Sequence, residues 1–369
     1  MTRLLQLERD ALLKPLQSVS GIVERRHTLP ILSNVLIETS GNTVSFTATD
    51  LEIQVSTSVS SDKAVDEQSV TVSARKLLDI LRALPENSAV SVELQNGRMS
   101  VRAGRSRFSL QTLAAEDFPR LASADGSVTR IKLQQKALRQ LLLLVQYSMA
   151  QQDIRYYLNG LLLVLEGGEL KVVATDGHRL AFASMGVEHA GEKQEVILPR
   201  KAVLELVRLL GEEDGEVEIE ISAAQVRFAV SGVVVLSKVV DGKFPDYARV
   251  IPSGYVKSIA LDRVILLQAL QRASILSNEK FRGVRWVLTE NSLRISCTNT
   301  DHEEAQEELE IEYGGEPLDI GFNVTYLLDV LNNVTSGRVE CAFGDASSSV
   351  LLTLPENAKF RYVVMPMRI

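Results

Sequence analysis

The chain has 369 residues, of which 45% are hydrophobic and 24% charged, and its formal net charge is −7. These values are typical of an ordinary globular protein, and no apolar run approaches the ~18 residues that a membrane-spanning helix needs. The negative charge argues against a protein that simply coats nucleic acid, although basic residues gathered on one face still attract phosphate groups locally.

The first part of the chain predicts a helix, then strands, then a second helix and further strands. Leu12, Leu16 and Val19 share one helical face, and an alternating run then predicts a half-buried strand that ends at Thr49-Asp50. A second helix is predicted from Arg75 onward. The strands expected after it are Ala89–Leu94, Arg98–Ala103 and Ser106–Gln111.

The same landmarks return twice further along the chain. Thr-Asp follows a predicted strand at steps of 126 and 125 residues, at positions 49–50, 175–176 and 300–301. The second-helix segments keep this spacing, at 75–81, 200–206 and 325–331. Phe-Pro pairs close the first two copies, at 118–119 and 244–245. The chain therefore reads as one unit present three times.

A repeat of this length predicts complete domains with their own cores. We expect boundaries that divide the chain into 1–125, 126–253 and 254–369. Each domain is predicted to be α+β, with an antiparallel sheet covered on one side by two helices.

The first helix of each copy carries basic and amide side chains on its polar face. They are Arg9, Lys14 and Gln17, then Lys136, Arg139 and Gln140, then Arg263, Gln271 and Arg272. Acidic residues gather elsewhere, at 212–214, 216–220 and 303–312. For any one helix a solvated exterior explains the pattern, but its recurrence predicts a cationic inner surface and an acidic outer one.

No enzyme signature is present: phosphate-binding loops, a dinucleotide fingerprint and a nucleophile elbow are all missing. Asp176 and His178 offer an acid–base pair as an alternative, but no nucleophile accompanies them, so we expect no catalysis. The four histidines lack metal-ligand spacing, and we expect neither a metal nor a cofactor. Cys297 and Cys341 are expected to be reduced core residues, and no leader segment is apparent, which predicts a cytoplasmic protein.

Two segments break the repeat. In residues 151–160, Tyr156 and Tyr157 follow Arg155, an arrangement that suits nucleic acid or peptide as well as the plugging of a domain edge. At the C-terminus, residues 363–369 place two methionines around Pro366, which suits either an adaptable binding surface or core filling.

Long strings of the chain resemble the β sliding clamps, the processivity subunits of bacterial DNA polymerase III. The resemblance covers nearly the whole chain and rests on residues 29–32, 104–110, 155–160, 174–180, 275–284, 321–324 and 362–368. It implies a head-to-tail homodimer whose six domains form a ring around double-stranded DNA, without sequence preference. It also implies partner proteins, such as the replicative polymerase, the clamp-loading ATPase, other polymerases and repair proteins, which dock through short apolar peptides. The alternative is a monomeric scaffold that binds peptides without encircling DNA.

The resemblance assigns three sets of site residues. The DNA-facing candidates are Arg26, Arg75, Gln152, Tyr156, Tyr157, Arg200 and Lys201. The peptide groove is implied to involve Leu158, Thr175, Gly177, His178, Arg179, Leu180, Pro245, Arg249, Val250, Asn323, Tyr326, Val363, Met365, Pro366 and Met367. The dimer contact is implied to join Arg105, Arg107, Phe108 and Leu110 of one chain to Ile275, Leu276, Glu303 and Glu304 of the other.

Overall fold

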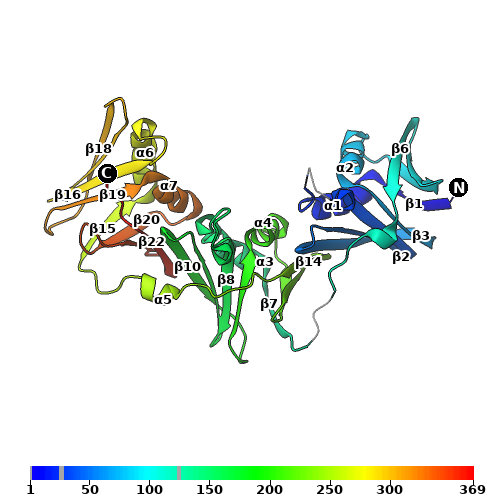
Figure 1. Cartoon of the computed structure of the whole chain (residues 1–369), viewed down its shortest axis with the longest axis horizontal. Coiled ribbons are helices and arrows are strands. Elements are labelled where there is room, and N and C mark those ends of the chain that lie inside the picture. Colours follow the sequence, from blue (N-terminus) through cyan, green and yellow to red (C-terminus); the bar gives the residue numbers. More distant parts are fainter. Residues whose placement is uncertain (1, 25–28, 123–125) are drawn as a thin grey trace. The chain divides into compact units, whose positions relative to one another are not determined.

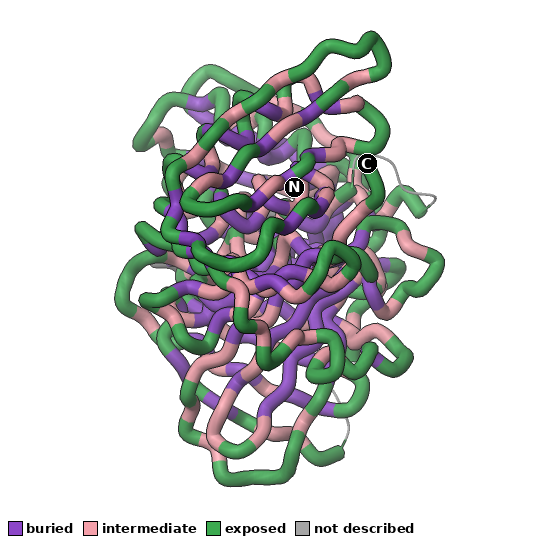
Figure 2. Tube along the Cα trace, turned by 90° about the vertical axis from the view of Figure 1, so that its left-hand side faces the viewer, coloured by how far each residue is buried: buried purple, intermediate pink, exposed green. Residues whose placement is uncertain are grey.

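The computed structural model describes residues 2–24, 29–122 and 126–369 (Figure 1). These residues form two compact units. Unit 1 comprises Met1–Lys136 and Leu204–Val239, and unit 2 comprises Ala137–Val203 and Val240–Ile369. Figure 2 shows the buried stretches of the chain in the interior and the exposed stretches mainly in the outlying loops.

The order strand, helix, strands, helix, strands occurs three times. The first repeat contains β1 (Thr2–Glu8), α1 (Arg9–Ser20), η1 (Pro30–Ser33), β2 (Asn34–Thr49), β3 (Ile53–Ser73), α2 (Ala74–Ala83), β4 (Ala89–Gln95), β5 (Arg98–Ala103), β6 (Ser106–Leu113) and η2 (Ala115–Asp117). The second contains β7 (Thr129–Gln134), α3 (Gln135–Leu143), η3 (Gln146–Ser148), η4 (Tyr156–Leu158), β8 (Gly160–Glu166), β9 (Glu169–Thr175), β10 (Arg179–Gly186), β11 (Gln194–Pro199), α4 (Arg200–Leu209), β12 (Glu216–Ile221), β13 (Gln225–Val230) and β14 (Val233–Lys238). The third contains α5 (Tyr247–Val250), β15 (Lys257–Asp262), α6 (Arg263–Ala273), η5 (Ser274–Leu276), β16 (Gly283–Thr289), β17 (Ser292–Thr298), β18 (Glu304–Glu310), β19 (Leu318–Asn323), α7 (Val324–Asn333), β20 (Arg338–Phe343), β21 (Val350–Leu354) and β22 (Asn357–Val364).

All strand pairs among the described residues are antiparallel, as the sequence predicts. In unit 1 the strands follow the order β1-β4-β5-β6-β3-β14-β13-β12-β7, with β2 paired to β3. In unit 2 one sheet has the order β11-β8-β9-β10-β22-β21-β20-β15, and a second has the order β18-β17-β16-β19. The helices lie against one face of these strands, with α1 on β2 and β3, and α6 on β17 and β18 (Figure 1).

Neighbouring repeats are joined by equivalent edge strands. β3 of the first repeat pairs with β14 of the second, and β10 of the second pairs with β22 of the third. At both junctions, the strand that follows the Thr-containing turn of one repeat pairs with the last strand of the next repeat. Because the sheet continues across each junction, the backbone groups of these edges are satisfied by hydrogen bonds between repeats.

The Thr-Asp turn is built in the same way in the first two repeats. Asp50 accepts the backbone N–H groups two and three residues later, and Asp176 does the same. In the third repeat Asn299 takes this place, because its Oδ1 accepts the N–H groups of residues 301 and 303. The structural equivalent is thus Thr298-Asn299, and the expectation of Thr300-Asp301 was wrong, because this loop is one residue longer.

In the first and third repeats, the first residue of the leading helix caps the second helix. Arg9 Nε donates to the carbonyl of Leu81 at 2.8 Å, and Arg263 Nη1 donates to the carbonyl of Leu331 at 3.0 Å. These carbonyls lie in the last turns of α2 and α7, which lack intrahelical partners. Arg9 and Arg263 therefore do not belong to a free basic face, which corrects the sequence-based expectation for these two residues.

Candidate functional site

An apolar cluster in unit 2 contains two of the expected groove residues, Leu180 and Val363. Leu180 of β10 and Val363 of β22 are paired in the sheet and are 2% and 1% exposed. Phe244 packs into the same cluster, and Tyr247 and Ile251 pack against it from the chain segment that precedes β15. One residue from each of the expected segments 175–180, 245–250 and 363–367 therefore lies in or against this cluster, namely Leu180, Tyr247 and Val363.

The turn between β9 and β10 forms one side of this place. Thr175 Oγ1 donates to the carbonyl of Arg179 at 2.6 Å and accepts the N–H of Gly177 at 3.1 Å. Gly177 has φ +89°, and a Cβ there would lie 3.0 Å from Nη2 of Arg155. The left-handed backbone favours glycine here, whereas the Arg155 side chain could shift to admit a Cβ. The turn presents the His178 side chain to solvent.

Arg179 is buried behind the turn and binds groups from two repeats. Its side chain is 9% exposed; Nε donates to Asp176 at 3.1 Å and Nη2 donates to the carbonyl of Tyr147 at 2.6 Å. Nη1 donates to Asp329 of α7 at 2.5 Å, and the guanidinium lies 4.5 Å from the ring centroid of Tyr326. Arg179 thus connects the second repeat to the third and acts as a support of the groove.

The surroundings keep this guanidinium charged. Burial lowers the pKa of Arg179, but Tyr362, Asp329 and Asp176 together raise it above its usual value. Tyr362 also donates its O–H to the carbonyl of Tyr326 at 2.8 Å, and burial raises the pKa of that phenol. The packing of Arg179 between two carboxylates and aromatic rings is typical of a rigid, fully engaged guanidinium.

The C-terminal tail lies directly beside the turn between β9 and β10. The N–H of Met365 donates to the carbonyl of His178 at 2.9 Å, and the N–H of Met367 donates to the carbonyl of Gly321 at 2.8 Å. A Cβ on Gly321 would lie 2.5 Å from the carbonyl oxygen of Met367 and 2.6 Å from Cδ1 of Ile369. The tail therefore packs directly on Gly321 of β19, and we call this residue the tail seat. No local sequence pattern predicts this role, because nothing near Gly321 in the chain distinguishes this glycine.

The expected groove residues divide into a floor, a support and an accessible rim. Buried floor residues are Leu158, Thr175, Leu180 and Val363. The accessible ones include His178, Pro245, Arg249, Val250 and Met365. Pro366 and Met367 are half-buried. Asn323 is the N-cap of α7 and accepts the N–H of Thr325 at 2.9 Å, and Tyr326 stacks on His178 with ring centroids 6.5 Å apart. Asp329 and Tyr147, which sequence reasoning missed, hold the Arg179 side chain that supports the floor. The one sequence signal for Asp329 was its position in a helix segment that recurs in the repeats.

Asp176 and His178 do not form a side-chain pair of the kind that acid–base catalysis needs. Asp176 Oδ1 accepts the backbone N–H groups of His178 and Arg179, and Oδ2 accepts Nε of Arg179. The carboxylate is thus engaged by the turn itself. The described ranges hold no group of three or more His, Cys, Asp or Glu side chains placed to hold a metal ion. Among the described residues no helix is long and apolar enough to cross a membrane.

A second set of candidates surrounds the N-terminus of α4. The N–H of Arg200 donates to the carbonyl of Asn159, and its Nη1 donates to the carbonyl of Met149 at 3.1 Å, so the loop 149–159 rests on α4. Burial lowers the pKa of Arg200. Tyr156 is 60% exposed and its ring meets that of Tyr157 edge-on at 6.4 Å, whereas Tyr157 packs against the apolar cluster.

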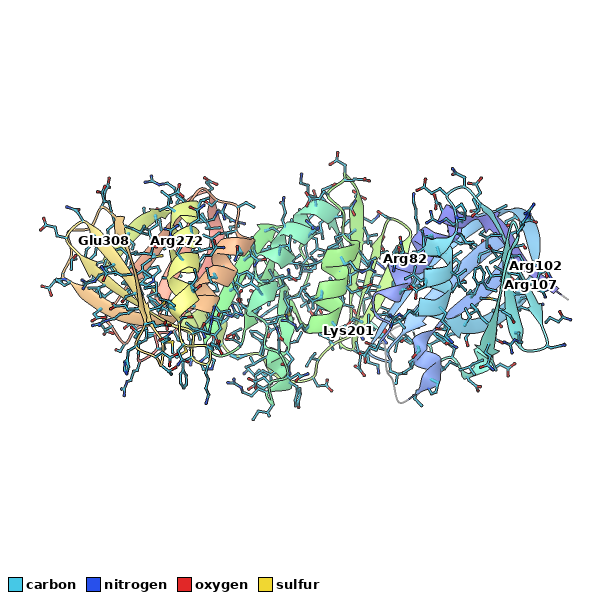
Figure 3. The ribbon with its side chains drawn as sticks, turned by 90° about the horizontal axis from the view of Figure 1, so that it is seen from above. Arg82, Arg102, Arg107, Lys201, Arg272 and Glu308 are labelled. Atoms are coloured by element: carbon cyan, nitrogen blue, oxygen red, sulfur yellow. The ribbon has the colours of Figure 1, made fainter. Side chains whose placement is uncertain are left out.

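The remaining DNA candidates are placed as follows. Gln152 is exposed in the same loop with φ +57°, and Lys201 is half-buried on α4 (Figure 3). Arg75 lies on α2 of unit 1. Its side chain is 64% exposed, and its Nε lies 3.8 Å from Oδ2 of Asp79. Arg26 lies outside the described residues. Of the basic residues expected on α6, Arg272 is engaged by both carboxylate oxygens of Glu307.

The dimer candidates lie on accessible edges of each unit. Arg107, Phe108 and Leu110 belong to β6, and Arg105 lies in the turn before it. Arg102 of β5 is paired with Arg107 in the sheet, and the two lie next to one another in Figure 3. Ile275 is 76% exposed and Leu276 is half-buried in η5; Glu304 begins β18 and Glu303 precedes it.

Comparison with known proteins matches this architecture along nearly the whole chain. Residues 4–122, 132–246 and 248–368 match the N-terminal, central and C-terminal domains of the DNA polymerase III beta subunit. The beta sliding clamp of Pseudomonas aeruginosa is 47% identical over 364 residues, 98% of this chain and 99% of that protein.

Solved structures agree. The crystal structure of DNA polymerase III subunit beta from P. aeruginosa has a TM-score of 0.95 and 47% identity, and covers 99% of this chain and 100% of that one. A sliding clamp from the same species bound to griselimycin has a TM-score of 0.95 and 46% identity, with 100% of each chain covered. The fold is therefore that of a three-domain DNA clamp. The chain belongs to the DNA polymerase III beta subunit family, the β sliding clamps.

Proposed function

We propose that two copies of this chain close head to tail into a ring around duplex DNA and hold DNA-processing proteins at the groove of unit 2. The observation that carries this proposal is the pattern of strand pairing at the repeat junctions. β3 pairs with β14, and β10 pairs with β22. The third-repeat equivalent of β3 and β10 is β18, and the first-repeat equivalent of β14 and β22 is β6. These two strands have no such partner in the described chain, apart from the last two residues of β6, which pair with β3. In a dimer, β18 of each chain can pair with β6 of the other chain, and these two equivalent contacts close the assembly.

The β3–β14 junction, taken as the template, predicts the register of the missing one. Across the first turn, Thr49 pairs with Gln54. Three residues after Gln54, Thr57 pairs with Val233, the first residue of β14. Ser106 is the first residue of β6, and Glu304 pairs with Thr298 across the third turn. Ser106 thus corresponds to Val233, and Glu307, three residues after Glu304, corresponds to Thr57. The expected pair is therefore Ser106 with Glu307, and antiparallel pairing then places Ser109 opposite Glu304.

This register gives complementary edges. Phe108 falls opposite Ala305, and both are half-buried on their own sheets. Arg107 falls opposite Gln306, so that Glu304 and Glu308 become its diagonal neighbours on the same face. Opposite charges at diagonal positions of an antiparallel pair attract each other within reach of long side chains.

Paired cysteines test the register. Ser109→Cys with Glu304→Cys is expected to give a covalent dimer on oxidation, because facing Cβ atoms in an antiparallel pair approach disulfide distance. Ser109→Cys with Glu308→Cys is the control and is expected to remain unlinked. The native Cys297 and Cys341 will not interfere, because burial raises their pKa values to about 11 and about 12. Linkage of the control alone contradicts the register.

A ring retains DNA by enclosing it, so sequence-independent contacts with phosphate suffice and no chemical step by this chain is required. We assign those contacts to Arg26, Arg75, Gln152, Tyr156, Tyr157, Arg200 and Lys201, and the domain boundaries to residues near 125 and 253. Protein loaded on circular DNA is expected to stay bound at high salt and to escape after linearisation. Equal loss from both forms, or a lasting monomer in solution, favours the alternative of an open peptide-binding scaffold.

We assign partner docking to the accessible rim around His178, Val250 and Met365 above the floor of Leu180 and Val363. Exposed apolar groups beside a preformed apolar floor suit a short peptide with an apolar end, which buries its side chains there. The polymerase, the clamp-loading ATPase and repair proteins are the partners expected to carry such peptides.

A further inference from the structure

Unit 1 contains a pocket on the outer face of the sheet where β3 meets β14. Its volume is about 350 Å³. It is lined by Gln54, Leu121, Val128, Arg130, Glu220, Ser222, Gln225, Arg227, Val234 and Leu236. Two side chains fix the segment that crosses its edge: Gln54 accepts the N–H of Leu121 at 3.0 Å, and Gln225 donates to the carbonyl of Ala122 at 2.9 Å.

The pocket occupies the same place in unit 1 as the candidate groove occupies in unit 2. Across the strands of unit 1 the paired residues run Gln54, Leu236, Arg227, Glu220, Arg130. The corresponding row in unit 2 runs Leu180, Val363, Leu351, Ala342, Ser258. The second row begins with two residues of the groove floor. The two rows have the same strand order and the same register, so both sites are products of one repeated junction.

The chemistry of the two rows differs. In unit 2 the row is uncharged. In unit 1 Glu220 is shared by two guanidinium groups, with Arg130 at 2.9 Å and Arg227 at 3.7 Å. Glu218 lies nearby and is 3.8 Å from Lys132, so three cations face two carboxylates on this part of the sheet. Arg130 is 65% exposed and Arg227 is 36% exposed, which leaves donors of both available.

We propose that this pocket is a second peptide site, which binds an acidic segment of a partner protein. A carboxylate of the segment pairs with Arg227 and Arg130, and an adjacent aliphatic side chain packs on Leu121, Val234 and Leu236. The volume lies at the low end for ligand sites and suits two neighbouring side chains. Charge-assisted hydrogen bonds from arginine supply the preference for a carboxylate over an amide.

Methyl NMR of the full chain tests this proposal with two probes, the peptides Ac-Ala-Glu-Leu-Ala-NH2 and Ac-Ala-Gln-Leu-Ala-NH2. The Glu peptide is expected to shift the methyl signals of Leu121, Val128, Val234 and Leu236 and to bind at least about tenfold more tightly than the Gln peptide. Arg227→Gln and, independently, Arg130→Gln are expected to abolish that difference. Arg102→Gln is the matched control, because Arg102 is 38% exposed and has a single carboxylate partner at 3.4 Å.

Three results overturn the proposal. They are shifts confined to Val363 and Leu351 of the other groove, equal affinity for the two peptides, and no shift at millimolar peptide. Retention of the full Glu preference in both arginine variants overturns it as well. Unchanged methyl signals of buried unit 1 residues outside the pocket, such as Leu81 and Val101, show that the variants are folded, so a loss of binding reports on the pocket.

Discussion

Seating of the C-terminal tail on Gly321 can be tested with one added methyl group. In Gly321→Ala the new Cβ would lie 2.5 Å from the carbonyl oxygen of Met367 and 2.6 Å from Cδ1 of Ile369, so the tail must move. The hydrogen bond from Met367 N–H to the Gly321 carbonyl, 2.8 Å long, is then lost. Gly321 has no positive φ, so alanine suits its strand and the effect is confined to the tail.

The expected magnitude follows from the contact that the bound peptide loses. One methionine side chain that no longer packs on a bound peptide contributes about 1–2 kcal/mol. Its loss weakens peptide binding by roughly 5- to 30-fold. The assay is fluorescence anisotropy with a labelled peptide that carries Gln and a Leu or Phe at its apolar end.

Two controls isolate the mechanism. Gly314→Ala is the matched glycine, because a Cβ there meets nothing within 4 Å, and it is expected to leave affinity unchanged. In a chain that lacks residues 365–369, Gly321→Ala is expected to have no further effect, while the dimer persists. Unchanged affinity in Gly321→Ala of the full chain, or an equal loss in both backgrounds, refutes the role of Gly321 as the tail seat.

Three further outcomes are expected. Arg179→Lys lowers the free energy of unfolding by about 3 kcal/mol in chemical denaturation and weakens peptide binding, since an ammonium cannot reach three acceptors in different directions; unchanged stability contradicts its supporting role. Arg155 holds the pKa of Asp153 at about 2, so this carboxylate stabilises its loop above pH ~4, and the contribution is lost as pH falls through about 2; NMR titration checks this, and Arg155→Gln is expected to return the pKa toward its ordinary value. Arg263→Ala lowers stability by about 1–2 kcal/mol without changing the salt dependence of DNA binding, whereas Arg75→Ala lowers that salt slope; the reverse assignment rejects our separation of capping and DNA-facing arginines.

The amino-acid sequence by itself determined the repeat, the α+β class and the antiparallel sheets. Period-two burial before Thr49 and Thr175, and amphipathic segments such as 75–81, are local patterns that each copy preserves. In the third copy the spacing predicts Thr300-Asp301 as the turn, and this prediction is wrong. Asn299 makes the equivalent bonds, and a loop longer by one residue cannot be recognised from spacing alone.

Only the tertiary structure decided which polar residues support the fold and which remain available. Arg9 and Arg263 look like exposed helix residues in the sequence, but they reach carbonyls 72 and 68 residues away. Arg179 and Asp329 are 150 residues apart and meet behind the groove, and Gly321 seats the tail. A side chain's neighbours across a sheet junction are set by chain folding, so periodicity, which records only burial along one element, does not contain them.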